Sequence, residues 1–136
     1  MTTNGCNQND PPSDDAWFTA RRWSNRMLVF TDHQPGAGEQ RTLLMGNDER
    51  LLDRDLLSIE LGTDQATLLV GNATDLPGST AFRDRYRIPS DRFAVVLVGK
   101  DGLVKERRDQ PMDPEELWSI IDAMPMRIDE MNRDRR

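Results

Sequence analysis

Short runs of apolar residues predict the central strands of a β-sheet. Residues 26–30 read Arg-Met-Leu-Val-Phe, and residues 93–98 read Phe-Ala-Val-Val-Leu-Val without a charge. A continuous apolar run of this length is typical of a strand that is buried on both faces. The leucine-rich segment 56–61 has the same character. We interpret 26–30 as the first and central strand of the sheet.

Two turns connect these strands to shorter neighbours. The polar residues 62–65 suffice to join 56–61 to a short strand at 66–70 as a hairpin. The pair Asp101-Gly102 lies between apolar runs, which is a strong hairpin signal. It leads into a return strand at 103–107, whose charged residues predict a position near the edge of the sheet.

Apolar residues at helical spacing predict helices between the strands. The first runs over 39–52 with leucines on one side, but Gly46-Asn47 weakens its middle and is expected to favour a split there. A second helix is expected from Pro77, and Pro89 signals its end. The aromatic cluster Trp17, Phe18 and Trp23, just before the first strand, is expected to cap the core.

The last helix has the clearest start. Asp113 is the expected cap, Pro114 suits the first helical position, and Glu116 completes a variant of the capping box. An apolar stripe then follows with helical spacing: Leu117, Ile120, Ile121 and Met124. Pro125 must kink or end this helix. The remaining residues, 126–136, alternate in charge and are expected to fray or to form a short extra helix.

The order of these elements predicts a thioredoxin-like α/β fold. A strand, a helix and a second strand require a parallel pair with a right-handed crossover, whereas the Asp101-Gly102 hairpin requires an antiparallel pair. A mixed parallel and antiparallel sheet with helices on both faces satisfies both conditions. Since 136 residues suit one ordinary domain, we expect a disordered polar tail at 1–15, a single domain at 16–131 and a charged tail at 132–136.

The charge of the chain argues against polyanions as its main partners. Its net charge is −6, whereas nucleic acids and anionic membranes favour clustered lysine and arginine. Only Lys100 and Lys105 are lysines, so arginine carries almost all the positive charge. We interpret this arginine content as genomic composition together with weak surface ion pairs.

Cysteine usage and the start of the chain bear on its compartment. The only cysteine is Cys6, in the polar tail, so no intramolecular disulfide can form. The chain begins without the basic start and apolar run of a signal peptide, and no stretch approaches the length of a membrane span. We therefore expect a soluble, cytoplasmic protein without membrane insertion; secretion or a periplasmic location remains open if a signal peptide has been removed.

Four segments carry a resemblance to known proteins. Residues 22–30, 86–89, 93–105 and 121–127 look like a bacterial domain-of-unknown-function family. The same module resembles the peroxiredoxin-like domains of animal sushi-repeat extracellular-matrix proteins. The Asp-Ala-Met-Pro-Met-Arg ending is the most telling of these segments, and the resemblance spans residues 17–131. It implies a thioredoxin-like fold and no settled activity.

The turn that carries the redox cysteine in such a fold has no cysteine in this sequence. Thioredoxin-like enzymes place a nucleophilic cysteine in the turn after the central strand, where the helix N-terminus stabilises the thiolate. Here that turn, 31–36, reads Thr-Asp-His-Gln-Pro-Gly. Nothing in the sequence fixes Cys6 near it. The proline expected before the third core strand is also missing, since Asp91, Arg92 or Phe93 occupies that position and Pro89 comes too early.

The same turn holds the candidate binding residues Thr31, Asp32 and His33. Unpaired backbone N–H groups at the start of the following helix can bind an anion or a partner's carboxylate, although Asp32 would compete for them. His33 is the only histidine, and with Asp32 it gives two adjacent residues where a metal site needs several converging ligands. We therefore expect no metal, no cofactor and no catalytic residue.

These observations favour a non-enzymatic binding or interaction module that recognises a protein or peptide. The alternative is a divergent thiol oxidoreductase or peroxiredoxin-like enzyme that uses Cys6 or a partner's thiol. A third class, an accessory protein that acts through oligomers, also remains open. The sequence alone decides neither the ligand nor the oligomeric state.

Overall fold

A single mixed sheet organises the molecule. The computed structural model describes residues 14–134, and its sheet has five strands in the order β3-β2-β1-β4-β5. The strands are β1 Arg26–Thr31, β2 Leu56–Leu61, β3 Ala66–Val70, β4 Val95–Val98 and β5 Val104–Arg108. The central strand β1 pairs in parallel with β2 and antiparallel with β4. The outer pairs β2–β3 and β4–β5 are both antiparallel, as the two predicted hairpins require.

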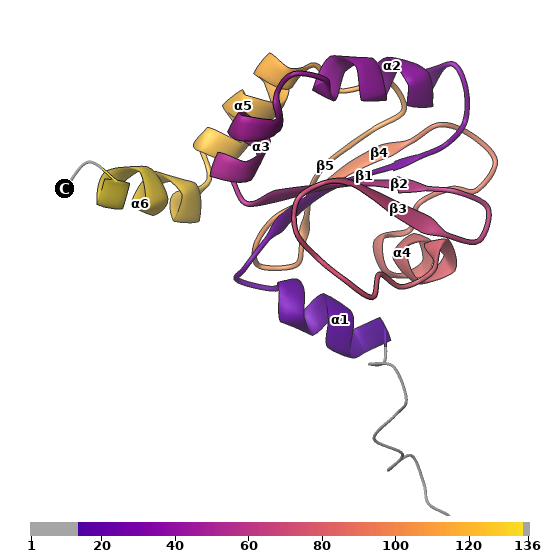
Figure 1. Cartoon of the computed structure of the whole chain (residues 1–136), viewed down its shortest axis with the longest axis horizontal. Coiled ribbons are helices and arrows are strands. Elements are labelled where there is room, and N and C mark those ends of the chain that lie inside the picture. The colour runs from indigo at the N-terminus through magenta and orange to yellow at the C-terminus, as the bar shows by residue number, and fades with distance from the viewer. Residues whose placement is uncertain (1–13, 135–136) are drawn as a thin grey trace, which may run out of the picture.

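Helices cover both faces of this sheet (Figure 1). Those of residues 14–134 are α1 Asp14–Arg21, α2 Gly36–Leu44, α3 Asp48–Asp53, α4 Ser79–Tyr86, α5 Pro114–Asp122 and α6 Pro125–Asp134. Helices α1 and α4 lie on one face, while α2, α3 and α5 lie on the other. The mixed α/β fold predicted from the order of the elements is therefore confirmed, and its arrangement is consistent with a thioredoxin-like fold.

The alternation of side chains along β1 divides the core in two. Met27 and Val29 belong to the cluster that α1 and α4 cover, whereas Leu28 and Phe30 belong to the cluster under α2, α3 and α5. All four side chains are essentially inaccessible to solvent. A strand that is buried on both faces explains why its sequence reads as a continuous apolar run.

Several helix boundaries differ from the expectation. The predicted helix at 39–52 is two helices, because Gly46 adopts a φ of +80° between α2 and α3, a conformation that favours glycine. Helix α1 was not predicted; its Trp17 and Phe18 pack edge-on against each other at 5.2 Å and against Phe82 of α4. As expected, these two aromatics belong to the core, but Trp23 is 59% exposed.

The C-terminal helices begin and end at prolines. Pro114 lies in the first turn of α5, and Pro125 begins α6, which continues to Asp134. The expected capping box is only half formed, because the side chain of Asp113 makes no capping hydrogen bond. The Glu116 carboxylate does accept the backbone N–H of Asp113.

Ion pairs attach α6 to the sheet. Arg26 of β1 is fully buried, and its guanidinium donates to both carboxylate oxygens of Glu130 at 3.2 and 3.1 Å. The ammonium of Lys100, which is also buried, contacts the same carboxylate at 2.7 Å. Burial raises the pKa of Glu130, but the hydrogen bonds from Arg26 and Lys100 outweigh this effect, so its pKa lies below the ordinary value.

No helix within residues 14–134 has the length and apolar character needed to cross a membrane. Cys6, most of the expected N-terminal tail and the last two residues of the expected C-terminal tail lie outside these residues, whereas 132–134 belong to α6.

Candidate functional site

The predicted site lies at one end of the sheet, where several strands begin or end. Thr31, the last residue of β1, pairs with Leu61, the last residue of β2. On the other side, Phe30 pairs with Val95 at the start of β4, and Val95 pairs with Arg108 at the end of β5. The turns and loops that leave these strands therefore share one end of the molecule.

Thr31 fixes the loop before β4. Its side chain is buried, and its Oγ1 donates to the carbonyl of Arg92 at 2.9 Å and accepts the N–H of Ala94 at 3.0 Å. The hydroxyl therefore has partners within the fold on both its donor and its acceptor side. Thr31 acts as a positioning residue between β1 and this loop.

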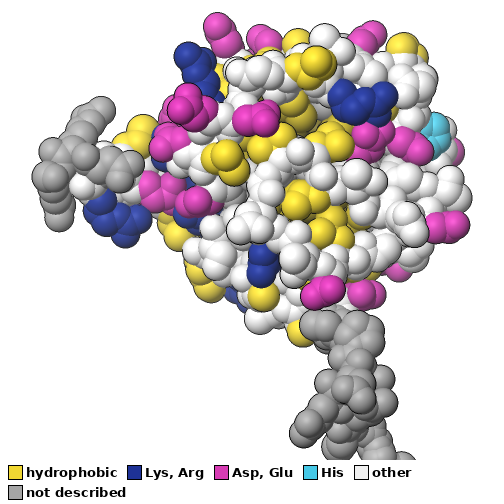
Figure 2. Space-filling model, viewed as in Figure 1, with side chains coloured by type: hydrophobic (Ala, Val, Ile, Leu, Met, Phe, Trp, Pro, Cys, Tyr) yellow, Lys and Arg dark blue, Asp and Glu magenta, His cyan; other side chains and the backbone are white. Residues whose placement is uncertain are grey.

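Asp32 and His33 reach the surface beside it. The side chains are 45% and 34% exposed, and Asp32 Oδ1 lies 3.8 Å from His33 Nδ1. That separation is too long for a hydrogen bond, and His33 Nδ1, which is itself buried, has no hydrogen-bond partner in the described part of the chain. The single histidine lies at the right-hand end of the face shown in Figure 2, with acidic side chains beside it.

The start of α2 does not offer the free amides that we expected. The N–H of Ala37 donates to the carbonyl of His33 at 2.9 Å, and the N–H of Gly38 donates to Oε1 of Gln34 at 3.1 Å. Sequence reasoning named Asp32 as the competitor for this helix end, but the side chain that reaches it belongs to Gln34. The expectation of unpaired N–H groups is therefore wrong for these two amides.

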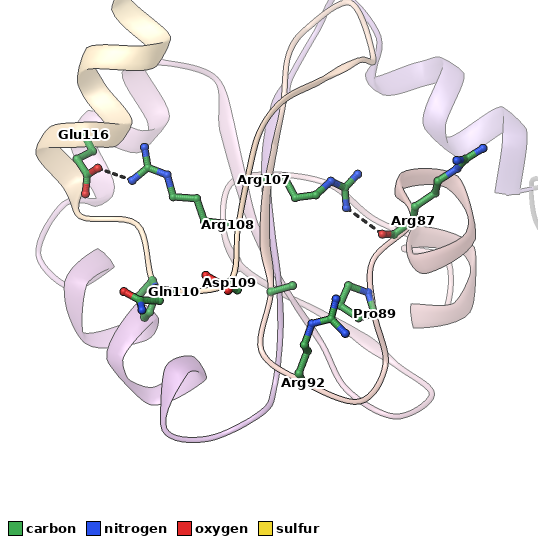
Figure 3. A pocket seen from close by; sticks show the side chains of 10 residues that line it. Arg87, Pro89, Arg92, Arg107, Arg108, Asp109, Gln110 and Glu116 are labelled. Carbon is green, nitrogen blue, oxygen red and sulfur yellow. Dashed lines mark hydrogen bonds and ion pairs between the residues drawn. The ribbon is translucent and has the colours of Figure 1, made fainter.

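A cavity of about 560 Å³ opens on the other side of the loop that Thr31 holds (Figure 3). Ala94, whose N–H bonds to Thr31, is part of its wall. The lining residues come from the end of α4, the loop before β4, the end of β5 and the start of α5: Arg87, Pro89, Arg92, Ala94, Arg107, Arg108, Asp109, Gln110, Pro111 and Glu116. We call it the arginine cavity, since four of these residues are arginines.

Two of these arginines project to opposite faces of β5. Arg107 lies opposite Val96 and points toward α4, where it donates to the carbonyls of Tyr86 and Arg87 at 2.5 and 2.8 Å. Arg108 lies opposite Val95 and points toward α5 (Figure 3). These orientations follow from the alternation of side chains along a strand.

Arg108 is the arginine that carboxylates neutralise. Its guanidinium bonds to Glu106 at 2.8 Å and to Glu116. The hydrogen bond from Arg108 lowers the pKa of Glu116, and the same bond, together with that to Glu106, raises the pKa of Arg108. Both groups stay charged over the physiological range.

The other three arginines have no comparable counter-ion. Arg87 caps α4 in the left-handed conformation, with φ 55° and ψ 53°, and its exposed side chain makes no hydrogen bond or ion pair within residues 14–134. Arg92 contacts only its neighbour Asp91, at 3.3 Å, and its side chain is 66% exposed. Among the described residues, Arg107 bonds to carbonyl groups. The interpretation of the arginines as members of weak surface ion pairs therefore holds for Arg92 and Arg108 but not for Arg87 and Arg107.

Sequence reasoning missed this cavity because its residues come from separate elements. The hairpin at Asp101-Gly102 predicts that Arg107 and Arg108 leave β5 on opposite faces, which is the one signal available beforehand. The approach of Arg87 and Arg92 depends on the course of the chain between α4 and β4. Among residues 14–134, no group of three or more His, Cys, Asp or Glu side chains is arranged to hold a metal ion.

One comparison with known proteins bears on the chain. Residues 18–130 match the model of a family described as a domain of unknown function, DUF4174.

Proposed function

We propose that this chain, which belongs to that family of domains of unknown function, is a non-enzymatic binding module that uses the end of its sheet to recognise a protein or peptide. One observation carries the proposal. The turn that leaves the central strand carries Thr31, Asp32 and His33, of which the first is a buried brace and the other two are exposed. No thiol lies in this turn.

The geometry of the turn after β1 suits binding of a partner better than catalysis. Rigid support under an exposed loop lowers the entropy lost when a partner orders it. Thr31 supplies that support, and Gln34 fixes the following turn through Gly38. Asp32 offers an exposed carboxylate acceptor, and His33 offers the exposed part of its ring, whereas its Nδ1 is buried. A partner with backbone N–H groups or a basic side chain fits the Asp32 carboxylate.

We also propose that the fold descends from thiol enzymes whose cysteine was replaced. The resemblance to peroxiredoxin-like domains of animal sushi-repeat proteins is part of this proposal. The competing function is thiol exchange through Cys6, which lies outside the described residues.

A redox assay separates the two functions. We expect neither insulin reduction nor peroxide consumption from the wild-type chain, and the same result from Cys6→Ser, because the thiolate-stabilising position holds no cysteine. Turnover that Cys6→Ser abolishes would establish the competing function.

Binding itself is tested by NMR on the 15N-labelled chain. A panel of short peptides of different charge is titrated, and we expect amide shifts to concentrate at residues 32–38 and 92–94. Asp32→Asn and His33→Gln should weaken the response, while the exposed carboxylate Asp48 provides a control as Asp48→Asn. Shifts below noise at 32–38 for every peptide would overturn the proposal.

A further inference from the structure

We propose that the arginine cavity is a binding site for a small organic oxyanion, a compound that carries a carboxylate or phosphate group. The inference goes beyond the proposed function, because it concerns another wall of the loop that Thr31 holds and a different class of ligand.

The cavity is positive in an acidic molecule. Four arginines line it against two carboxylates, Asp109 and Glu116, while the whole chain carries a net charge of −6. Glu116 is already bonded to Arg108. The side chain of Arg87 points away from the cavity (Figure 3). This leaves Arg92 and Arg107 on the α4 side without a carboxylate from the cavity lining, so a bound anion would relieve the mutual repulsion of these guanidinium groups.

The guanidinium of Arg92 is available to a ligand. Its pair with Asp91 is exposed, with side chains 66% and 78% accessible. An ion pair of that exposure contributes little, so a ligand displaces it at small cost. A guanidinium presents several N–H donors in a plane and binds carboxylate or phosphate through two parallel hydrogen bonds.

The remaining arginine is fixed in place before any ligand arrives. Arg107 is held by the carbonyls of Tyr86 and Arg87 at the C-terminal end of α4. Its charge therefore stays beside the cavity without a carboxylate of its own. Figure 3 shows Arg107 and Arg92 on the α4 side of the cavity, with Asp109 and Gln110 across from them.

The size of the cavity indicates a small molecule. Its volume of about 560 Å³ falls within the range of roughly 300–1,000 Å³ that is usual for ligand pockets. The loop that forms one wall is anchored by both hydrogen bonds of Thr31, so the site is preformed. Asp109 and Gln110, neither of which has a bond to another described residue, can accept or donate at the end of the ligand away from the anionic group.

The test titrates the 15N-labelled full chain at low ionic strength with inorganic phosphate in one arm and succinate in the other. Sodium chloride at matched ionic strength corrects for salt. We expect saturable amide shifts at 87–94 and 107–111 in at least one arm, and the arm with the tighter binding identifies the anionic group. Arg92→Gln should weaken binding about tenfold or more, since a hydrogen bond to a charged group is worth about that factor.

Arg50→Gln is the matched control. It removes one positive charge from an exposed side chain on α3 that makes no ion pair with another described residue and does not line the cavity, and it should leave binding unchanged. Equal weakening by Arg50→Gln, or shifts no larger than those in sodium chloride, would overturn the oxyanion site. Peptide-induced shifts at 32–38 would persist in that case if the proposed function alone is right, so the two failures are distinguishable.

Discussion

Two buried polar side chains, Gln40 and Thr31, bond to the main chain of distant segments. Gln40 of α2 is fully buried, and its amide exchanges two hydrogen bonds with the backbone of Met112, at 3.1 and 2.8 Å. Thr31 makes the corresponding pair of bonds to the loop before β4. A buried donor or acceptor without a partner costs about 1–3 kcal/mol. Each side chain thus specifies the position of a segment that has no strand or helix to fix it.

Tyr86, the only tyrosine of the chain, allows a test of burial at a single residue. Burial raises the pKa of Tyr86 to about 12, against a smaller opposing effect of Arg85. Because the folded value lies above the unfolded one, the associated stability is present below the unfolded pKa of 10.0 and is lost as the pH rises toward 12. We expect near-ultraviolet titration of the native protein to show phenolate formation near pH 12.

The urea-unfolded chain provides the reference for that titration. Its tyrosine should ionise near the ordinary value of about 10. The free energy of unfolding, measured with urea, should fall between these two pH values. Phenolate formation near the ordinary value in the folded protein would contradict the burial of Tyr86.

At the scale of elements, α6 depends on charge where the other helices depend on apolar packing. None of its side chains belongs to the buried part of either core cluster. Arg127 of α6 is 4% exposed and bonds to Asp53 at 2.7 Å and to Asp122 at 3.1 Å. Together with the contacts of Glu130, these bonds join α6 to α3, α5 and β1. Removing one partner of a buried ion pair leaves the other charge uncompensated, which is strongly destabilising.

Glu130→Gln tests this attachment. Neutralising the carboxylate leaves the buried Arg26 and Lys100 without the counter-ion they share, so we expect the free energy of unfolding at neutral pH to fall by about 3 kcal/mol. The pKa of Glu130 is lowered in the folded state. Its contribution is therefore present above the ordinary carboxylate range and is lost as the pH falls through the lower folded value.

The difference between wild type and Glu130→Gln should consequently shrink in acid. Urea denaturation at a series of pH values measures it. Glu39→Gln is the control, because Glu39 is exposed and its side chain bonds to no other described residue, and it should change stability by no more than about 0.5 kcal/mol. A pH-independent difference would show that Glu130 acts through packing instead of charge.

At the scale of the whole molecule, the sequence predicts the sheet well because each strand is specified locally. β2 and β3 have the predicted bounds, β1 extends one residue further than predicted, and β5 is shifted by one residue at both ends. The apolar runs and the turn residues between them are sufficient to locate these strands in the sequence. β4 begins two residues late, at Val95, because Phe93 and Ala94 belong to the loop that Thr31 holds and Phe93 packs against Gly36.

Features that depend on tertiary contacts could not be predicted in the same way. The run 26–30 gives no sign that Arg26 would be fully buried against a helix more than a hundred residues away. The three candidate site residues are adjacent in sequence, yet the fold commits Thr31 to the loop and exposes only Asp32 and His33. The arginine cavity combines residues from four segments, and such an approach is set by packing instead of local pattern.

Both halves of the core share β1, which makes the fold one cooperative unit. Trp17 is buried on the α1 and α4 face, Trp118 on the face of α2, α3 and α5, and Trp23 is exposed. Since neither cluster retains its sheet surface without the central strands, we expect both faces to unfold together. Labelling with 5-fluorotryptophan gives each indole its own 19F signal, and Trp→Phe variants assign the signals.

Urea titration should then show the native signals of Trp17 and Trp118 disappearing at the same midpoint and with the same slope. The signal of Trp23 should move least between the folded and unfolded states, because its side chain is already 59% exposed. Earlier loss of the Trp17 signal would mean that α1 and α4 detach while the opposite face remains packed. The sheet would then join two separable layers, and the Thr31 brace would have to keep its loop in place with only one face of β1 still covered.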